Sequence, residues 1–79
     1  MLYVIWSFRH NQWWQGSQSG YSPHLESAGR YTTEEAADIT IGGGLPGANI
    51  AIDEALAMSQ FAGSLPSEVL TKLNTWRTL

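Results

Sequence analysis

Hydrophobic and polar positions along the chain predict short strands first and helices afterwards. Residues Leu2–Phe8 are mostly β-branched and aromatic, which is typical of a strand that is at least partly covered on both faces. Gln12–Gln15 contains two adjacent tryptophans and is expected to pair with this strand after a turn at Arg9–Asn11. Tyr21 is expected in a short extended piece, whereas Leu25–Gly29 has no decisive pattern.

The strongest local signal predicts a helix after Tyr31. Thr32 is a candidate N-cap and Glu35 follows three residues later, which is the spacing of a capping box. The helix is expected to end at Gly42–Gly44, which would serve as cap and hinge. Just before the helix, Gly29 is expected to adopt the positive φ that closes a turn.

The segment after the glycine triplet leaves two interpretations open. The alternation in Asn49–Ile52 favours a short strand, after which Asp53 would cap a helix over Glu54–Phe61. The alternative is one helix from residue 48 to residue 62. The expected apolar anchors of the shorter helix are Leu56, Met58 and Phe61.

A final helix is predicted from Ser64 or Leu65, with Pro66 in its first turn, where the missing N–H costs little. Its apolar stripe at helical spacing is expected to pack on the core and consists of Val69, Leu70, Leu73 and Trp76. The elements together predict an α+β fold, a small antiparallel sheet of two or three strands packed with two or three short helices. The length of 79 residues fits a single small domain, 1–79.

Composition narrows the classes of protein. The chain has no cysteine, which excludes a disulfide frame and a zinc–thiolate site. The apolar run Leu2–Trp6 is far shorter than the roughly 20 residues that span a bilayer. We therefore expect a soluble cytoplasmic protein with no membrane partner.

The acidic residues are more informative by position than by number. Residues 31–71 contain six acidic side chains and neither Lys nor Arg, although the net charge of the whole chain is only −3. Glu34 and Asp38 lie four residues apart and would share a helix face, with Glu35 beside them. Such a surface repels nucleic acid and attracts a basic protein surface. The alternative is an ordinary solvated face.

The aromatic residues gather in the first part of the chain. Seven of the nine lie within residues 1–31. Because adjacent side chains of a strand point to opposite faces, at most one of Trp13 and Trp14 faces the core directly. The other tryptophan, together with Tyr21, is a candidate for partner contact, since exposed Trp and Tyr are frequent in binding hot spots. The alternative is a large aromatic core.

No catalytic or metal-binding pattern is recognisable. His10 and His24 could form a metal site with Glu26 or Asp38, but the sequence lacks HExxH and any His pair four residues apart. There is no GxSxG elbow, and the glycine triplet lacks the Lys-Ser/Thr ending of a phosphate loop. We therefore expect no catalytic residues, no metal and no cofactor.

One part of the chain resembles known sequences. The motifs are YVIWS–x2–HN–x–WW at Tyr3–Trp14, Gly20–Tyr21, Ala28–Tyr31 and Glu34–Ala36. Together they resemble a group of short uncharacterised proteins from phages and prophages of alphaproteobacteria, over about residues 3–37. Many members have a proline after the paired tryptophans, whereas this chain reads Gln15–Ser19 there. In size and character the chain is also similar to anti-CRISPR proteins, in particular inhibitors of type I-C systems.

The resemblance implies a stoichiometric inhibitor in the host bacterial cytoplasm, expected to be a monomer. It would dock on a basic protein surface of the type I-C Cascade surveillance complex, or on its recruited nuclease, without binding nucleic acid itself. The candidate partner-binding residues are Glu34, Glu35, Asp38, Asp53, Glu54, Trp13, Trp14 and Tyr21. The alternative is a small nucleic-acid-binding or regulatory phage protein that uses the aromatic residues with Arg9 and Arg30.

Overall fold

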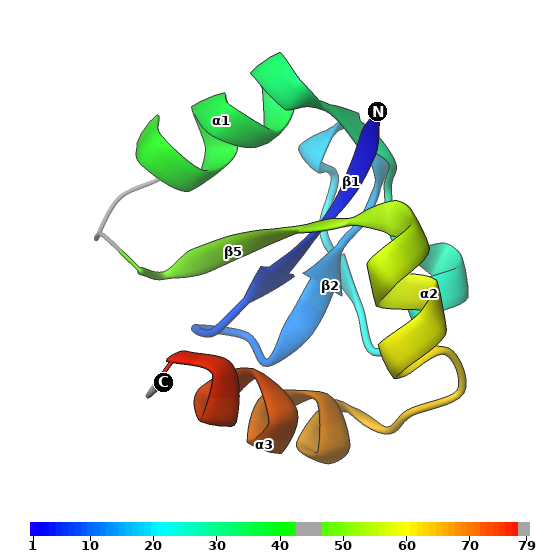
Figure 1. The fold of residues 1–79 in the computed structure, drawn as a ribbon. Helices are drawn as coiled ribbons and strands as arrows, with labels where there is room; N and C mark the ends of the chain where they lie inside the picture. Colours follow the sequence, from blue (N-terminus) through cyan, green and yellow to red (C-terminus); the bar gives the residue numbers. More distant parts are fainter. Residues whose placement is uncertain (43–46, 78–79) are drawn as a thin grey trace.

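The computed structural model describes residues 1–42 and 47–77 and shows a five-stranded antiparallel sheet between helices (Figure 1). The strands are β1 (Leu2–Ser7), β2 (Gln12–Trp14), β3 (Tyr21–Ser22), β4 (Tyr31–Thr32) and β5 (Asn49–Asp53). The helices are α1 (Thr33–Gly42), α2 (Glu54–Phe61) and α3 (Pro66–Arg77), with 3-10 turns at Gly16–Gln18 and Leu25–Ser27. The predicted α+β class is confirmed, with five strands in the sheet where two or three were expected.

Strand β1 is the centre of the sheet. Along one of its edges it pairs with β5, which places Tyr3 opposite Asp53 and Ser7 opposite Asn49. The other edge is shared, because β2 pairs with the Trp6 end of β1 and β4 with its Leu2 end. Strand β3 then extends the sheet beyond β2. The strand interpretation of residues 49–52 is therefore correct, and the continuous helix is not formed.

Both faces of β1 are covered, as its unbroken apolar run predicted. Val4 and Trp6 belong to the core on the face packed by α2 and α3, whereas Ile5 belongs to the core on the face packed by α1. The period-2 alternation of a strand sends successive side chains to these two sides. The result is a three-layer arrangement, with α1 above the sheet and α3 below it in Figure 1.

The two tryptophans of β2 separate as strand geometry requires. Trp13 is fully buried on the α2/α3 side, where its ring centroid lies 5.0 Å from that of Trp6 and 5.9 Å from that of Phe61. Trp14 is half-buried on the opposite face and donates its indole N–H to Asn49 Oδ1 at 3.0 Å. The prediction that only one of them faces the main core is confirmed.

Side-chain caps begin α1 and α2 where the sequence predicted, whereas α3 begins one or two residues later than predicted. Thr32 Oγ1 accepts the Glu35 N–H at 3.2 Å, and Glu35 Oε1 accepts the Thr32 N–H at 2.9 Å, which completes the capping box of α1. Asp53 Oδ2 accepts the Leu56 N–H at 3.1 Å and caps α2. At α3, which begins at Pro66, Glu68 Oε1 accepts the Leu65 N–H at 2.8 Å.

The expected stripe of α3 is confirmed, since Val69 and Leu73 are buried and Leu70 and Trp76 pack against the core.

The anchors predicted for α2 were partly wrong. Phe61 is buried, but Leu56 and Met58 are 46% and 40% exposed, and the small Ala57 takes the buried position. The short helix meets the core through Ala57 and Phe61, four residues apart, so that only part of its apolar surface is covered.

Gly29 was predicted to adopt a positive φ, and this prediction was wrong. Positive φ occurs instead at Gly20, Gly47 and Gly63, and at two non-glycine residues, Asn11 and Ser17. Gly29 is required by close approach, because an added Cβ would lie 2.7 Å from the backbone of Gly16. Helix α1 extends to Gly42, but residues 43 and 44 of the predicted hinge lie outside the described residues.

Candidate protein-binding surface

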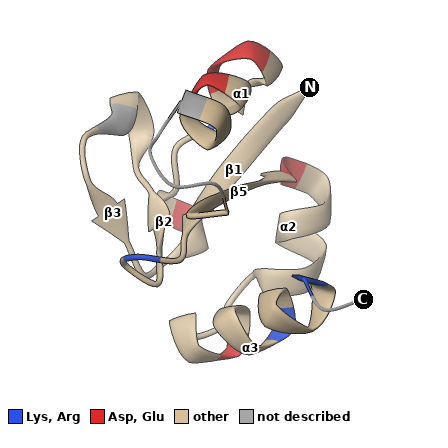
Figure 2. Ribbon diagram, turned by 90° about the vertical axis from the view of Figure 1, so that its left-hand side faces the viewer, with Lys and Arg blue, Asp and Glu red and all other residues tan. Residues whose placement is uncertain are grey.

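Charge is distributed unevenly between the two ends of the sheet. The Leu2 end of β1 lies beside Thr32, which directly precedes α1, and beside Asp53, which directly precedes α2. Both helix starts carry acidic residues there, as Figure 2 shows. The turn after the other end of β1 carries Arg9, and Arg77 stacks over the Phe8 ring with 4.2 Å between its guanidinium carbon and the ring centroid. The molecule is therefore acidic at one end of β1 and basic at the other.

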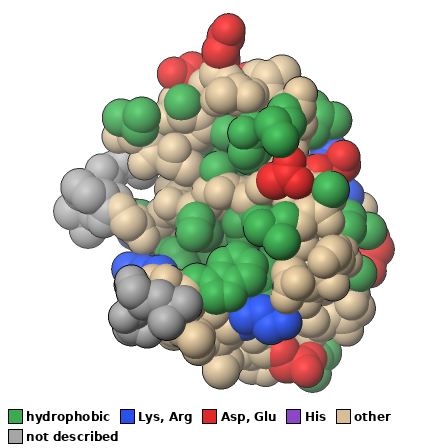
Figure 3. Space-filling model, in the orientation of Figure 1, with side chains coloured by type: hydrophobic (Ala, Val, Ile, Leu, Met, Phe, Trp, Pro, Cys, Tyr) green, Lys and Arg blue, Asp and Glu red, His purple; other side chains and the backbone are tan. Residues whose placement is uncertain are grey.

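The space-filling view shows this separation only in part. Acidic side chains lie over α1 and near the start of α2, where basic atoms also lie beside them, and further basic side chains lie lower, beside α3 (Figure 3). Glu68 is an exception, because this acid belongs to α3. The acidic end is thus a surface feature of the fold as well as a property of the sequence.

The acids of α1 differ in what they do. Glu34 and Asp38 are exposed, and neither forms an ion pair with any side chain in the described ranges. The Glu35 carboxylate accepts the Thr32 N–H and so takes part in the cap of its own helix. The helix dipole favours acids in the first turn, so Glu34 and Glu35 are stabilised there without an ion pair to a described residue. Glu34 and Asp38 are the side chains free to meet a basic partner.

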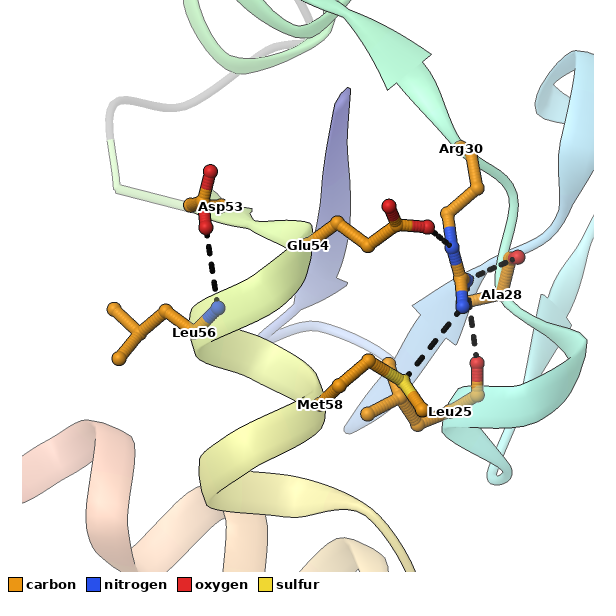
Figure 4. A network of polar contacts seen from close by, with 7 residues as sticks. All are labelled: Leu25, Ala28, Arg30, Asp53, Glu54, Leu56 and Met58. Carbon is orange, nitrogen blue, oxygen red and sulfur yellow. Dashed lines mark hydrogen bonds and ion pairs between the residues drawn. The ribbon is translucent and has the colours of Figure 1, made fainter. Parts of the chain in front are cut away.

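The second pair of candidate acids has structural partners. Asp53 caps α2, and Glu54 forms an ion pair with Arg30 in which the guanidinium nitrogen and the carboxylate oxygen are 2.5 Å apart. Arg30 also donates to the backbone oxygens of Ala28, at 2.8 Å, and Leu25, at 3.4 Å (Figure 4). These contacts tie the segment before β4 to the first turn of α2.

Both ionic side chains of this pair stay in contact with water, Arg30 being 27% and Glu54 39% exposed. An exposed ion pair contributes at most about 1 kcal/mol, so that its main effect is on the position of the segment. Sequence reasoning missed the pair because the two residues are 24 positions apart. Arg30 is therefore engaged within the fold, which weakens the case for it as a nucleic-acid contact.

The candidate aromatic residues are divided between core and surface. Trp13 is fully buried, which leaves it no surface to offer a partner. Trp14 and Tyr21 are cross-strand partners on the α1 side of the sheet, with ring centroids 5.5 Å apart. Tyr21 also stacks on the exposed His10 ring, with 3.9 Å between centroids. This contact, which joins the β1–β2 turn to β3, was not predicted.

The structure thus brings four of the predicted residues to one side of the sheet. We call this set the α1 face, and it consists of Glu34, Asp38, Trp14 and Tyr21. Glu34 lies in the first turn of α1, near the Leu2 end of β1, whereas Tyr21 stacks on His10 beyond the other end, so this face offers carboxylates and half-buried aromatic rings in different places. Both kinds of group serve in protein interfaces. The other candidates have structural roles: Trp13 is part of the core, Asp53 caps α2, and Glu54 forms the ion pair with Arg30.

Other kinds of site find little support in the described ranges. Among residues 1–42 and 47–77, no three His, Asp or Glu side chains are close enough to hold a metal ion. His10 and His24 are both exposed. Within the same ranges, no helix has the length and apolar character needed to cross a bilayer.

Comparisons with protein-family models, with curated proteins and with solved structures found no match to this chain.

Proposed function

We propose that this chain is a small inhibitory binding protein that docks its α1 face on a basic, DNA-binding protein surface. The observation that carries the proposal is the pair of exposed carboxylates on α1, Glu34 and Asp38, which form no ion pair with any described residue. Their mutual repulsion costs a few tenths of a kcal/mol, which a basic partner would relieve. Trp14 and Tyr21 would add apolar contact on the same side of the sheet.

The mode of action in this proposal is occupancy. A bound acidic face excludes nucleic acid both by volume and by charge, and no turnover or cofactor is needed. The resemblance to phage proteins makes type I-C Cascade the partner to test, with its recruited nuclease as the next. A net charge of −3 is small for full mimicry of DNA, so the aromatic rings would have to supply part of the affinity.

The test is capture of purified type I-C Cascade by the tagged chain at low and high salt, followed by a DNA-binding assay. We expect Glu34→Lys with Asp38→Lys to slow association at low salt by at least about tenfold, because steering depends on these charges. Glu35 stays unchanged in this variant because its carboxylate caps α1. Capture without loss of DNA binding would move the proposal to nuclease recruitment.

A matched control distinguishes the effect of charge on α1 from the effect of the net charge of the chain. Asp38→Lys and Glu26→Lys change the net charge equally, and both residues are exposed, but Glu26 lies in the 3-10 turn Leu25–Ser27, away from α1. Only the α1 variant is expected to weaken capture. If both variants act equally, or if the double variant is captured like the original chain, the α1 face is not the docking surface.

One observation favours a second function, the binding of single-stranded nucleic acid. His10, Tyr21 and Trp14 form a continuous run of ring contacts, and Arg9 lies beside it in the β1–β2 turn without a polar contact to any described residue. Bases stack on such rings. This function predicts quenching of tryptophan fluorescence by an oligonucleotide. Trp14→Phe should remove the quenching, because Trp6 and Trp13 are buried and the half-buried Trp76 packs on the opposite side of the sheet. An unchanged spectrum excludes it.

A further inference from the structure

Strand β5 has a free edge. It pairs with β1 along its whole length, and no residue in 1–42 or 47–77 pairs with its other side. Soluble proteins protect such edges with Lys, Pro, bulges or very short strands. Residues Asn49–Asp53 contain no Lys, no Pro and no bulge in their register, and the strand spans five residues. This edge therefore has the backbone groups that a further strand needs.

The register identifies which groups face outward. The Phe8 N–H donates to the Ala48 carbonyl at 2.9 Å, which makes this pair a hydrogen-bonded one. Antiparallel pairs alternate between bonded and non-bonded, so Ile50 and Ile52 direct their N–H and C=O groups toward β1. Asn49 and Ala51 then direct both groups toward the free edge, whereas Asp53 offers only its N–H there, because the carbonyl of an N-cap residue accepts the first bond of its own helix. Three residues at alternate positions are ready to bond to one partner strand.

We propose that two copies of this chain pair through β5, antiparallel, about a two-fold axis at Ala51. In this register Ala51 faces the partner's Ala51, and Asn49 faces the partner's Asp53. The Ala51 pair exchanges two backbone hydrogen bonds, and each Asp53 N–H can donate to the partner's Asn49 carbonyl. One continuous sheet would then run through both copies. The proposal departs from the sequence-based expectation of a monomer.

The side chains beside this edge support burial. Ile50 is half-buried and packs against the α2/α3 core, and in the proposed register it faces the partner's Ile52. Figure 3 shows apolar side chains gathered along this side of the molecule. Leu56 is 46% exposed at the start of α2, and Figure 4 shows it pointing away from Arg30. Pairing of the edges would bring apolar residues of the two copies together below the sheet.

Charge favours a second copy over an unrelated strand. The Asp53 end of β5 is acidic, whereas Arg77 lies at the opposite end, stacked on Phe8 and 3.6 Å from the position that a Cβ on Gly47 would take. An antiparallel two-fold pairing sets the acidic end of each copy against the basic end of the other. The acidic and the basic group thus lie at the two ends of the same edge in each copy. An interface between two identical surfaces requires such self-complementary charges.

The dimer can be tested independently of the proposed function. We expect sedimentation of the purified chain, over a series from micromolar to millimolar concentration, to show a reversible monomer–dimer equilibrium. Ala51→Pro should raise the dissociation constant by about tenfold or more, because it removes an outward N–H at the axis and leaves the bonds to β1 intact. Circular dichroism checks that the variant keeps its fold. A monomer at every concentration would overturn the proposal.

Cysteine cross-linking tests the register, since the chain contains no cysteine of its own. Ala51→Cys should form an inter-chain disulfide on mild oxidation, because the two axial Cα atoms would lie about 5.5 Å apart. Asn49→Cys is the matched control from the same strand and the same face, and its two copies would be too distant to join. Cross-linking at residue 49 but not at 51, or a dimer that Ala51→Pro leaves unchanged, would refute this pairing.

Discussion

The two faces of the sheet bury very different amounts of apolar side chain. On the α2/α3 side, the described core includes Trp6, Trp13 and Phe61 within a cluster of ten buried residues. On the α1 side, the cluster has four buried residues, of which α1 itself supplies only Ala36 and Ile39. Most of the hydrophobic stabilisation therefore lies on one side, because burial of apolar area is its main source.

This difference shows how a small chain can combine stability with an exposed binding surface. Glu34 and Asp38 lie on the exposed surface of α1, apart from its two buried residues, Ala36 and Ile39, so substitutions there affect few core contacts. Regions with few buried apolar contacts also open locally at lower free energy. We expect the thick core to determine global unfolding and α1 to respond locally.

The largest expected effect comes from the adjacent tryptophans, which point to the two faces. Trp13→Ala should lower the free energy of unfolding by about 3–5 kcal/mol, a large part of the roughly 4–12 kcal/mol available to a domain of this length. Trp14→Ala should cost about 1–3 kcal/mol, because Trp14 is half-buried and loses one hydrogen bond to Asn49. Urea unfolding followed by circular dichroism measures both. Equal costs would contradict the unequal division of the core.

A smaller effect is expected where two backbones touch. Gly29→Ala would place a Cβ 2.7 Å from the Gly16 Cα and nitrogen and 2.8 Å from the Gln15 carbonyl carbon. Because backbone atoms cannot rotate away, we expect a loss of about 1–3 kcal/mol. Gly16→Ala is the matched control, since nothing lies within 4 Å of its added Cβ, and it should stay within about 0.5 kcal/mol of the original. Thermal unfolding of both variants decides the point, and similar losses would argue against close packing.

The features that the sequence predicted well depend on neighbours only a few positions away. The Thr32–Glu35 cap, the α3 stripe and the alternation that defines β5 all follow from local spacing. The separation of Trp13 from Trp14 was predicted for the same reason, although local spacing could not say which of the two enters the thick core. For the candidate site, this reasoning placed Glu34 and Asp38 correctly on an exposed helix surface.

The features that it missed depend on contacts between distant parts of the chain. The Arg30–Glu54 pair, the approach of Gly29 to Gly16 and the stacking of Tyr21 on His10 join residues from different elements. The free edge of β5 belongs to this class too, because it appears only when all strand partners are known. No periodicity in the sequence encodes these contacts.

The smallest of these effects tests whether α1 responds locally. Thr32→Ala removes the acceptor of the Glu35 N–H and should cost about 1 kcal/mol, whereas Thr33→Ala, whose hydroxyl makes no hydrogen bond to a described residue, should be nearly neutral. Because Ala36 and Ile39 are the only buried anchors of the helix among the described residues, the loss should appear mainly as faster hydrogen exchange of the α1 amides. Exchange in β1 and α3 should change much less. If all amides accelerate together, α1 unfolds with the rest of the domain, and the two faces form one cooperative unit despite their unequal cores.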